Sequence, residues 1–351
     1  MKGPTVTELT PNQTITSIYL VHNKEVRQKT SGEPYLSLVL GDRTGEIDAK
    51  MWDNVSEIAD TFGRDDFVRV KGETLVYNNR LQLRVHRVAR VADSEVDLAD
   101  FLPVSKRDPE EMFAELMAAV RAMKDPWLRQ LLEAVLGDPE IAAAYKKAPA
   151  AKAIHHAWLG GLLEHVLSLI LLARDAARHY PIVDQDLLLT GVVLHDIGKI
   201  SELSYERSFS YSSEGQLIGH ILIGLRIVGE KASAIPGFPP KLRLLVEHMI
   251  LSHHGQLEFG SPKVPLFAEA LLLHHLDNMD SKMEALRAAL ERDQANPGEW
   301  TAYNHALERP LLNKDRYLSS APAAKAPAKK PKAPPPTTFG AQLFDALKKD
   351  E

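Results

Sequence analysis

Between residues 12 and 92, apolar and polar side chains alternate with a period of two. The segments 35–40 (YLSLVL) and 80–86 (RLQLRVH) show the alternation, and short runs rich in Gly, Asn and Asp separate such segments. Because successive side chains of a strand point to opposite faces, this pattern predicts about four or five short strands that are buried on one face. We therefore expect a small β-barrel in this region.

From Asp108 onward the apolar residues recur at helical spacing instead. The change begins at Asp108-Pro109-Glu110-Glu111, which supplies an N-cap, a proline in the first turn and acids at the positive helix end. We expect about seven helices up to residue 310, with breaks at 137–139, 180–181, 235–240 and 261–262. The predicted fold class is α+β, with an N-terminal β-barrel followed by an all-α bundle.

The end of the chain has a different composition. Of the seventeen residues at 321–337, sixteen are Ala, Pro or Lys. This composition cannot bury a core, so it predicts a disordered, solvated linker. Beyond it, Phe339, Leu343, Phe344 and Leu347 share one helical face. Two readings fit that face: a short helix that docks on an unknown protein, and a frayed terminal helix with no partner.

The length of 351 residues suits two domains. We predict a barrel domain at 1–95, a helical connector at 96–150, a second domain at 151–310, and a low-complexity linker with a short helix at 311–351.

Composition excludes several classes of protein. With 44% hydrophobic and 25% charged residues, the chain is typical of globular proteins. It has no apolar run near the roughly 20 residues of a membrane span and no apolar N-terminal segment, so we expect a cytoplasmic protein without a membrane partner. The absence of cysteine excludes disulfides, thiolate nucleophiles and cysteine-ligated metals. Any metal must be held by nitrogen and oxygen.

A formal net charge of −5 gives no general attraction to nucleic acid, so binding would need a local basic surface. Residues 67–91 hold six Lys or Arg and one acid, and strand alternation exposes some of these cations. The candidates for nucleic-acid binding are Arg69, Lys71, Arg80, Arg84 and Arg87, with Tyr35 and Trp52 as platforms for base stacking. The alternatives are a solvated strand face for the cations and rim packing for the aromatic rings.

Histidines gather in the helical region, where eleven of the fourteen lie between His155 and His275. Burying imidazole and carboxylate groups among Leu and Val is costly unless they are paired or bind metal. The candidates are His165, His195, Asp196, His220, His253, His254 and Asp277, and Lys199 adds a cation beside them. We read His179, His248 and His305 as core histidines bonded to backbone carbonyls. His155, His156, His274 and His275 stay open as orienting groups or substrate contacts.

This order of residues resembles the HD-domain metal-dependent phosphohydrolase superfamily. The resemblance spans about 120 residues and rests on His-Asp-Ile-Gly-Lys at 195–199, with a helical histidine upstream and a helical aspartate downstream. It implies that His165, His195, Asp196 and Asp277 form a metal site. It also implies that His220, with one or both of His253 and His254, completes a second metal position. Lys199 and Asp196 would then take part in phosphoester hydrolysis.

The segment 36–53 (LSLVLGDRTGEIDAKMWD) resembles two strands of an OB-fold of the nucleic-acid-binding type. An OB-like domain before an HD-like domain resembles the YhaM family of 3′→5′ exoribonucleases, including the phrases at 209–220 and 265–280. This resemblance implies release of nucleoside monophosphates from single-stranded RNA, and often DNA. It implies Mn²⁺ or Co²⁺ as the cofactor, while the donor types also suit Fe²⁺, Ni²⁺ or Zn²⁺, as one or two ions.

Two other classes of function stay open at this point. One is an HD-type phosphohydrolase acting on a small nucleotide, with the OB domain in regulation or oligomer contacts. The other is a single-strand-binding protein whose metal site is structural. A homo-oligomer, such as a ring, would suit processive handling of a strand.

Overall fold

A computed structural model describes residues 3–78, 80–152, 156–205, 207, 210–293 and 298–319. The structure divides into two compact units, Met1–Ala288 and Ala289–Glu351, which we describe separately. The predicted linker at 321–337 and the predicted docking helix at 339–348 lie outside the described residues. The domain boundaries proposed above stay predictions.

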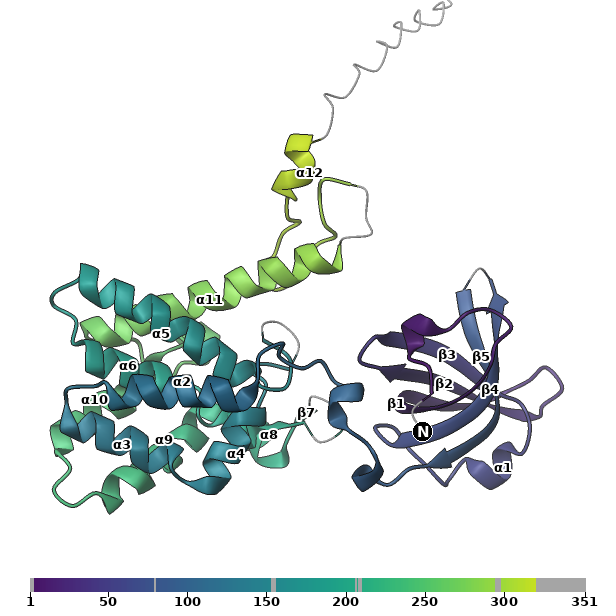
Figure 1. The fold of residues 1–351 in the computed structure, drawn as a ribbon, viewed down its shortest axis with the longest axis horizontal. Helices are drawn as coiled ribbons and strands as arrows, with labels where there is room; N and C mark the ends of the chain where they lie inside the picture. The colour runs from purple at the N-terminus through teal and green to yellow at the C-terminus, as the bar shows by residue number, and fades with distance from the viewer. Residues whose placement is uncertain are drawn as a thin grey trace, which may run out of the picture. The chain divides into compact units, whose positions relative to one another are not determined.

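The N-terminal strands form a closed barrel in the order β1-β2-β3-β5-β4 (Figure 1). They are β1 (Thr14–Gln28), β2 (Pro34–Asp42), β3 (Gly45–Met51), β4 (Phe67–Tyr77) and β5 (Arg80–Arg90). Neighbouring strands are antiparallel except β3 and β5, whose parallel pairing closes the barrel. The predicted barrel is therefore confirmed.

Side-chain alternation places the barrel core where the sequence predicts it. Leu36, Leu38 and Leu40 of β2 are buried, and on β5 the buried Leu83 and Val85 flank an exposed arginine. The short helix α1 (Val55–Ile58) and the 3₁₀ turns η1 (Val6–Glu8), η2 (Asp93–Glu95) and η3 (Leu98–Asp100) accompany the barrel. On β5 the outer face is thus left to solvent, where polar side chains can bind a ligand, whereas Leu20 of β1 and Phe67 of β4 are covered on the outside by Phe101.

The helical part begins at the predicted N-cap, Asp108, whose carboxylate accepts from the backbone N–H groups of Glu110 and Glu111. Its helices are α2 (Pro109–Arg121), α3 (Pro126–Leu136), α4 (Pro139–Lys147), α5 (Gly161–His179), α6 (Gln185–Leu194), α7 (Lys199–Glu202), α8 (Ser213–Ile218), α9 (His220–Ala234), α10 (Pro240–Ser252) and α11 (Ala268–Arg292). All four predicted breaks separate consecutive helices (Figure 1). The helices bury one large apolar core of Leu, Val, Ile and Met side chains.

The prediction of about seven helices and nothing else in this region is wrong. The described residues of 108–292 hold ten helices, two of them short, and a hairpin of β6 (Leu203–Ser204) and β7 (Ser210–Tyr211). Ser212 ends this hairpin and caps α8, because its hydroxyl accepts from the N–H of Gly215. Serine-rich sequence favours such local bonds over helix.

The unit at 289–351 holds the end of α11 and the short helix α12 (Lys314–Ser319). Between them, antiparallel bridges join Trp300 to Leu312 and Asn304 to Arg309, where we predicted helix. Aromatic and β-branched residues such as Trp300 and Thr301 prefer this extended backbone. Among the described residues, no helix combines the length and apolar character that crossing a bilayer requires.

Asp186 holds the junction between α2 and α3 against α6, which leads to a first prediction. Its buried carboxylate accepts from the backbone N–H groups of Lys124 at 2.6 Å and Asp125 at 2.7 Å. Replacement Asp186→Ala leaves both donors unsatisfied, and we expect a loss of about 3 kcal/mol in the free energy of unfolding, measured with urea. The exposed control Asp175→Ala should change that free energy by less than about 0.5 kcal/mol. Equal effects of the two substitutions would contradict this role.

Candidate metal centre and nucleic-acid interface

The predicted ligands come from five helices and meet in one place. His165 lies on α5, His195 and Asp196 directly follow α6, and His220 begins α9. His253 and His254 directly follow α10, and Asp277 lies on α11. Three ligand atoms of His165, His195 and Asp277 lie within 4.8 Å of one another, as do those of His220, His253 and His254. The structure therefore places six of the seven residues in two groups, and the seventh, Asp196, lies close to members of both.

Helix ends orient two of these imidazoles. The last carbonyls of a helix have no partner within the helix. Nδ1 of His195 lies 2.9 Å from the carbonyl oxygen of Val192, and Nδ1 of His253 lies 2.8 Å from that of Ile250. A carbonyl oxygen only accepts, so Nδ1 carries the proton in both rings. In the neutral ring, Nε2 of His195 and of His253 is consequently unprotonated and available to a metal.

In the other three histidines, Nδ1 also lies close to a hydrogen-bond acceptor. Nδ1 of His254 donates to the carbonyl oxygen of Phe259 at 2.9 Å. Carboxylates orient the other two rings: Nδ1 of His220 lies 3.0 Å from Glu202, and Nδ1 of His165 lies 2.8 Å from Asp280. In metal sites, an acceptor on the second ring nitrogen fixes the tautomer and strengthens the ligand nitrogen. The structure thus leaves Nε2 of each of the five histidines directed at the cluster as a candidate ligand atom.

The Asp196 carboxylate is at the centre of the cluster. Nε2 of His195 lies 3.3 Å from Oδ2, while Nε2 of His220 and of His253 lie 3.4 and 3.7 Å from Oδ1. On the α11 side, Nε2 of His165 lies 3.3 Å from Oδ1 of Asp277.

The buried donor atoms fit a metal ion. Among the described residues, Nε2 of His195, His220 and His253 and Oδ1 of Asp196 are buried without a hydrogen-bond partner. Leaving such atoms unpaired costs free energy, which a bound cation would remove. Imidazole nitrogen with carboxylate oxygen suits divalent transition metals such as Mn²⁺, Fe²⁺, Co²⁺, Ni²⁺ and Zn²⁺. The cluster could therefore hold a divalent metal, and its donor atoms do not select one element.

The electrostatics keep the two carboxylates ionised. Burial alone would raise the pKa of Asp196, but Lys199 and His195 hold it well below its usual range. Burial likewise opposes ionisation of Asp277, and His165 and His195 lower its pKa below the ordinary value. Both groups are therefore charged at neutral pH, as metal ligands must be.

The histidines divide into two kinds. Burial, and then neighbouring imidazoles, lower the pKa of His253 and of His254, so both are neutral. His165 differs: burial opposes its charge, but Asp277 and Asp280 raise its pKa to about 9. Asp277 and Asp280 thus keep His165 protonated although it is buried, so the site favours a positive charge. A divalent cation would supply that charge in place of the proton.

Lys199 lies beside the cluster. Its Nζ lies 2.6 Å from Oδ2 of Asp196, one helical turn earlier, and its side chain is mostly buried. It lines two cavities, one with His220 and Tyr211 and the other with Asp196 and His254. The ammonium group is therefore placed to face an anionic ligand in either cavity.

Our sequence analysis missed two orienting carboxylates, Asp280 and Glu202. Asp280 accepts from His165 and from the hydroxyl of Ser168 at 2.5 Å, and His156 lies 3.3 Å away. A usable signal was the helical spacing of Asp277 and Asp280, which places both on one face of α11. Glu202 gave a similar signal, three residues after Lys199.

Replacing the first of these carboxylates gives a second prediction. Asp280→Asn keeps the shape but weakens the acceptor for Nδ1 of His165, so we expect metal affinity to fall about 10- to 100-fold. Isothermal titration with Mn²⁺ measures this affinity. His275→Gln, on the exposed face of the same helix, is the control and should leave the affinity unchanged. An Asp280→Asn protein with wild-type affinity would remove Asp280 from the site.

The structure separates the remaining histidines. His274 donates from Nδ1 to the carbonyl oxygen of His253 at 2.9 Å and so supports the turn after α10, whereas His275 is exposed. His155 lies outside the described residues. Our reading of three core histidines is wrong: His179 and His305 are exposed. The third, His248, is half-buried, and its Nε2 accepts from the N–H of Leu266 rather than bonding a carbonyl.

On the barrel, most of the predicted cations project outward. Within the described residues, Lys71, Arg80, Arg84 and Arg87 are exposed and form no ion pair, although Glu73 is the cross-strand partner of Arg84. Their positive charges are therefore available to phosphate groups.

The parallel pairing of β3 with β5 joins the two parts of the predicted interface. Lys50 of β3 lies opposite Arg84 of β5, and Trp52 follows Lys50 by two residues on the outer face. The half-buried rings of Tyr35 and Trp52 stack on each other, with centroids 4.6 Å apart and planes 24° apart. The sequence analysis did not include Lys50, although residues two apart in a strand lie on the same face and Lys50 is two residues before Trp52.

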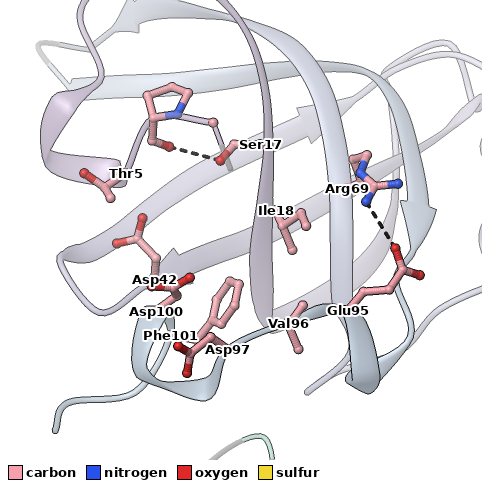
Figure 2. A pocket seen from close by; sticks show the side chains of 12 residues that line it. Thr5, Ser17, Ile18, Asp42, Arg69, Glu95, Val96, Asp97, Asp100 and Phe101 are labelled. Carbon is pink, nitrogen blue, oxygen red and sulfur yellow. Dashed lines mark hydrogen bonds and ion pairs between the residues drawn. The ribbon is translucent and has the colours of Figure 1, made fainter. Parts of the chain in front are cut away.

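Arg69 differs from the other cations. It lines a cavity of about 350 Å³ with the acids Asp42, Glu95, Asp97 and Asp100. Figure 2 shows its guanidinium directed at Glu95, with the nearest atoms 3.5 Å apart. An arginine in acidic surroundings attracts phosphate less than one with free charge. Arg69 is therefore the weakest of the five predicted cations.

Comparison with protein families identifies both domain types. Residues 20–90 match the model of the OB-fold nucleic acid binding domain, described as tRNA_anti-codon, and residues 162–282 match the model of the HD domain. The chain therefore combines an OB-fold domain of nucleic-acid-binding type with an HD domain, the domain of metal-dependent phosphohydrolases. Every residue of the histidine cluster described above falls within the HD match.

Solved structures resemble parts of the chain. The second OB-fold domain of replication protein A from Methanococcus maripaludis is 24% identical, over 25% of this chain and 93% of that chain, with a TM-score of 0.21. A mitochondrial single-stranded DNA binding protein from S. cerevisiae is 10% identical, over 23% and 97%, with a TM-score of 0.20. A putative aspartyl-tRNA synthetase from Leishmania major Friedlin is 14% identical, over 47% and 39%, with a TM-score of 0.19.

Proposed function

We propose that this protein is a metal-dependent 3′→5′ exoribonuclease that hydrolyses single-stranded RNA, and also single-stranded DNA, to nucleoside 5′-monophosphates. The observation that carries the proposal is the cluster around Asp196, where three buried Nε2 atoms lack hydrogen-bond partners among the described residues. In a chain that also has an OB-fold domain, a phosphohydrolase site of this kind is best suited to a nucleic acid substrate.

The proposed chemistry divides between the metal and the protein. When bound, a divalent ion supplies activation of water and neutralises negative charge on the phosphoryl group. His165, His195, Asp196 and Asp277 hold one ion, and His220, His253 and His254 hold a second. Asp196 and Glu202 also set the charge and orientation of the groups around them.

Lys199 has a role of its own in the proposed reaction. Its Nζ donates to Asp196 and faces the cavity in which the scissile phosphate would lie. A fixed cation there favours the charge that develops in the transition state more than the charge of the ground state.

The barrel holds the strand in this proposal. Lys71, Arg80, Arg84 and Arg87 offer free charges to phosphates, and the Tyr35–Trp52 pair offers an aromatic face to a base. The direction of degradation, the preference for RNA and the choice of Mn²⁺ rest on the resemblance to the YhaM family.

One experiment tests the proposal directly. Chelator-stripped protein, reloaded with Mn²⁺, is incubated with a 5′-labelled single-stranded RNA of about 20 nucleotides, and the products are resolved by length. We expect a ladder that shortens from the 3′ end, no cleavage without metal, and no cleavage of an RNA with a 3′-terminal phosphate block. Internal fragments would contradict an exonuclease. An uncut strand, with hydrolysis of a small nucleotide instead, would favour the alternative phosphohydrolase.

A further inference from the structure

A cavity of about 430 Å³ opens directly at the histidine cluster. One part of its lining consists of Asp196, His253, His254 and Asp277, with Lys199 beside them. The rest includes Phe259, Asn278 and Ser281, which have no place in the metal site. Its volume is in the range of small-molecule sites, so it has room for more than a phosphate group.

Phe259 is the unexplained residue of this lining. It ends the 3₁₀ turn η4 (Leu257–Phe259) and is 63% exposed, although large aromatic side chains are usually buried. The turn is firmly held, because the carbonyl oxygen of Phe259 accepts from Nδ1 of His254 at 2.9 Å. The hydroxyl of Ser261 adds bonds to the carbonyls of Leu251 and Lys263. The turn that carries the exposed ring of Phe259 is therefore held in place by a candidate metal ligand.

The approach of this turn to α11 explains the glycine after His254. Gly255 has a φ of +80°, and a Cβ atom there would lie 2.3 Å from the ring of His274. Only glycine allows this backbone to pass so close to His274, which itself donates to the carbonyl of His253. The positions of Phe259 and of the two candidate ligands that follow α10 are thus determined by the same turn.

The wall formed by α11 is polar and uncharged at this point. Asn278 and Ser281 are half-buried and line the cavity, and the hydroxyl of Ser281 lies 3.5 Å from Oδ1 of Asp277. Amide and hydroxyl groups both donate and accept hydrogen bonds, so they can bind the hydroxyl groups of a sugar. The cavity therefore has three kinds of lining: the candidate metal ligands with Lys199, a neutral polar wall, and an exposed aromatic ring.

We propose that this cavity binds one nucleotide, with its base stacked on Phe259, its sugar against Asn278 and Ser281, and its phosphate at the metal cluster. The inference rests on the proposed function and adds the site for the nucleotide that is released. Stacking on a phenyl ring tolerates every base, because all bases have a π-face. The site would therefore accept adenine and uracil alike.

The neighbouring cavity of about 250 Å³ is less suited to this role. It also reaches Lys199 and His220, and its aromatic residue is Tyr211. Its volume lies below the usual range of small-molecule sites, whereas the volume of the cavity at Phe259 lies within that range. Among the described residues that line the two cavities, Phe259 is the better platform.

The test compares ligands that differ only by the base. Full-length protein loaded with Mn²⁺ is titrated calorimetrically with AMP, UMP and ribose 5-phosphate. We expect AMP and UMP to bind about 5- to 150-fold more tightly than ribose 5-phosphate, from the stacking of one base. Phe259→Ala should abolish this preference without changing the affinity for ribose 5-phosphate, and Phe259→Trp should keep it.

A matched control lies on the same turn. Leu257 is 66% exposed and does not line the cavity, so Leu257→Ala should retain the full preference for nucleotides. Equal affinities of AMP and ribose 5-phosphate for the unmodified protein, or a preference that survives in Phe259→Ala, would overturn the inference. Absence of binding by any of the three probes would overturn it too. If the protein shows the preference for nucleotides but leaves RNA uncut, only the proposed exonuclease activity is refuted.

Discussion

Asp196→Asn is expected to reduce phosphodiester hydrolysis by about 10³-fold or more while leaving strand binding intact. Asn keeps the shape of the side chain but removes the charge that Lys199, His195 and His220 share. The three surrounding Nε2 atoms would then face a neutral amide that binds a divalent ion poorly. Hydrolysis of the labelled RNA measures the first effect, and a gel shift in chelator measures the second.

Folding must be separated from chemistry in this experiment. The substitution leaves Lys199 without its carboxylate partner, so far-ultraviolet circular dichroism and urea unfolding should accompany the assay. Asp277→Asn removes a different carboxylate and should show the same loss of hydrolysis. The exposed Asp175→Asn is the matched control and should retain full activity. Turnover by the Asp196→Asn protein in metal-replete buffer would refute the assignment.

The combined substitution Arg84→Ala and Arg87→Ala should weaken binding of single-stranded RNA roughly 20-fold at 0.1 M salt. Both arginines are exposed on β5 and lack ion pairs with the described residues, so each can neutralise one phosphate. Losing two such contacts should reduce the slope of log affinity against log salt by about 1.4. Fluorescence anisotropy at several salt concentrations measures both quantities.

The control removes the same charge from another surface. Arg121 and Arg178 lie at the exposed ends of α2 and α5. Their combined replacement by alanine should leave the salt slope unchanged. A slope that is equal in the Arg84 and Arg87 variant and in the unmodified protein would exclude this face of the barrel from RNA binding.

Local sequence rules account for much of the fold. Alternation with a period of two is a property of the strand itself, so Leu36, Leu38 and Leu40 could be assigned to a core before the barrel was known. The Asp-Pro starts at 108 and 138 likewise report helix N-termini, because the cap forms within four residues. The hairpin of β6 and β7 was missed because both strands are two residues long, too short for any period to appear.

The sequence alone also determined which chemistry the helical domain can support. Because the chain has no cysteine and places histidines and aspartates in apolar segments, the sequence predicted a metal site with nitrogen and oxygen ligands. The sequence could not show how each imidazole ring is oriented. That depends on acceptors far away in the chain, such as Asp280 for His165, or on the helix end at Ile250 for His253.

On the barrel, the sequence by itself determined that basic residues alternate outward along β4 and β5. Only the tertiary structure decided which of them share a surface with the aromatic residues, because the parallel pairing of β3 with β5 joins Lys50 to Arg84. The same holds for Phe259, whose importance comes from a cavity that residues of several helices and a turn line together. Spacing along the chain reports a residue's own helix or strand, whereas a site depends on contacts between elements, which folding alone establishes.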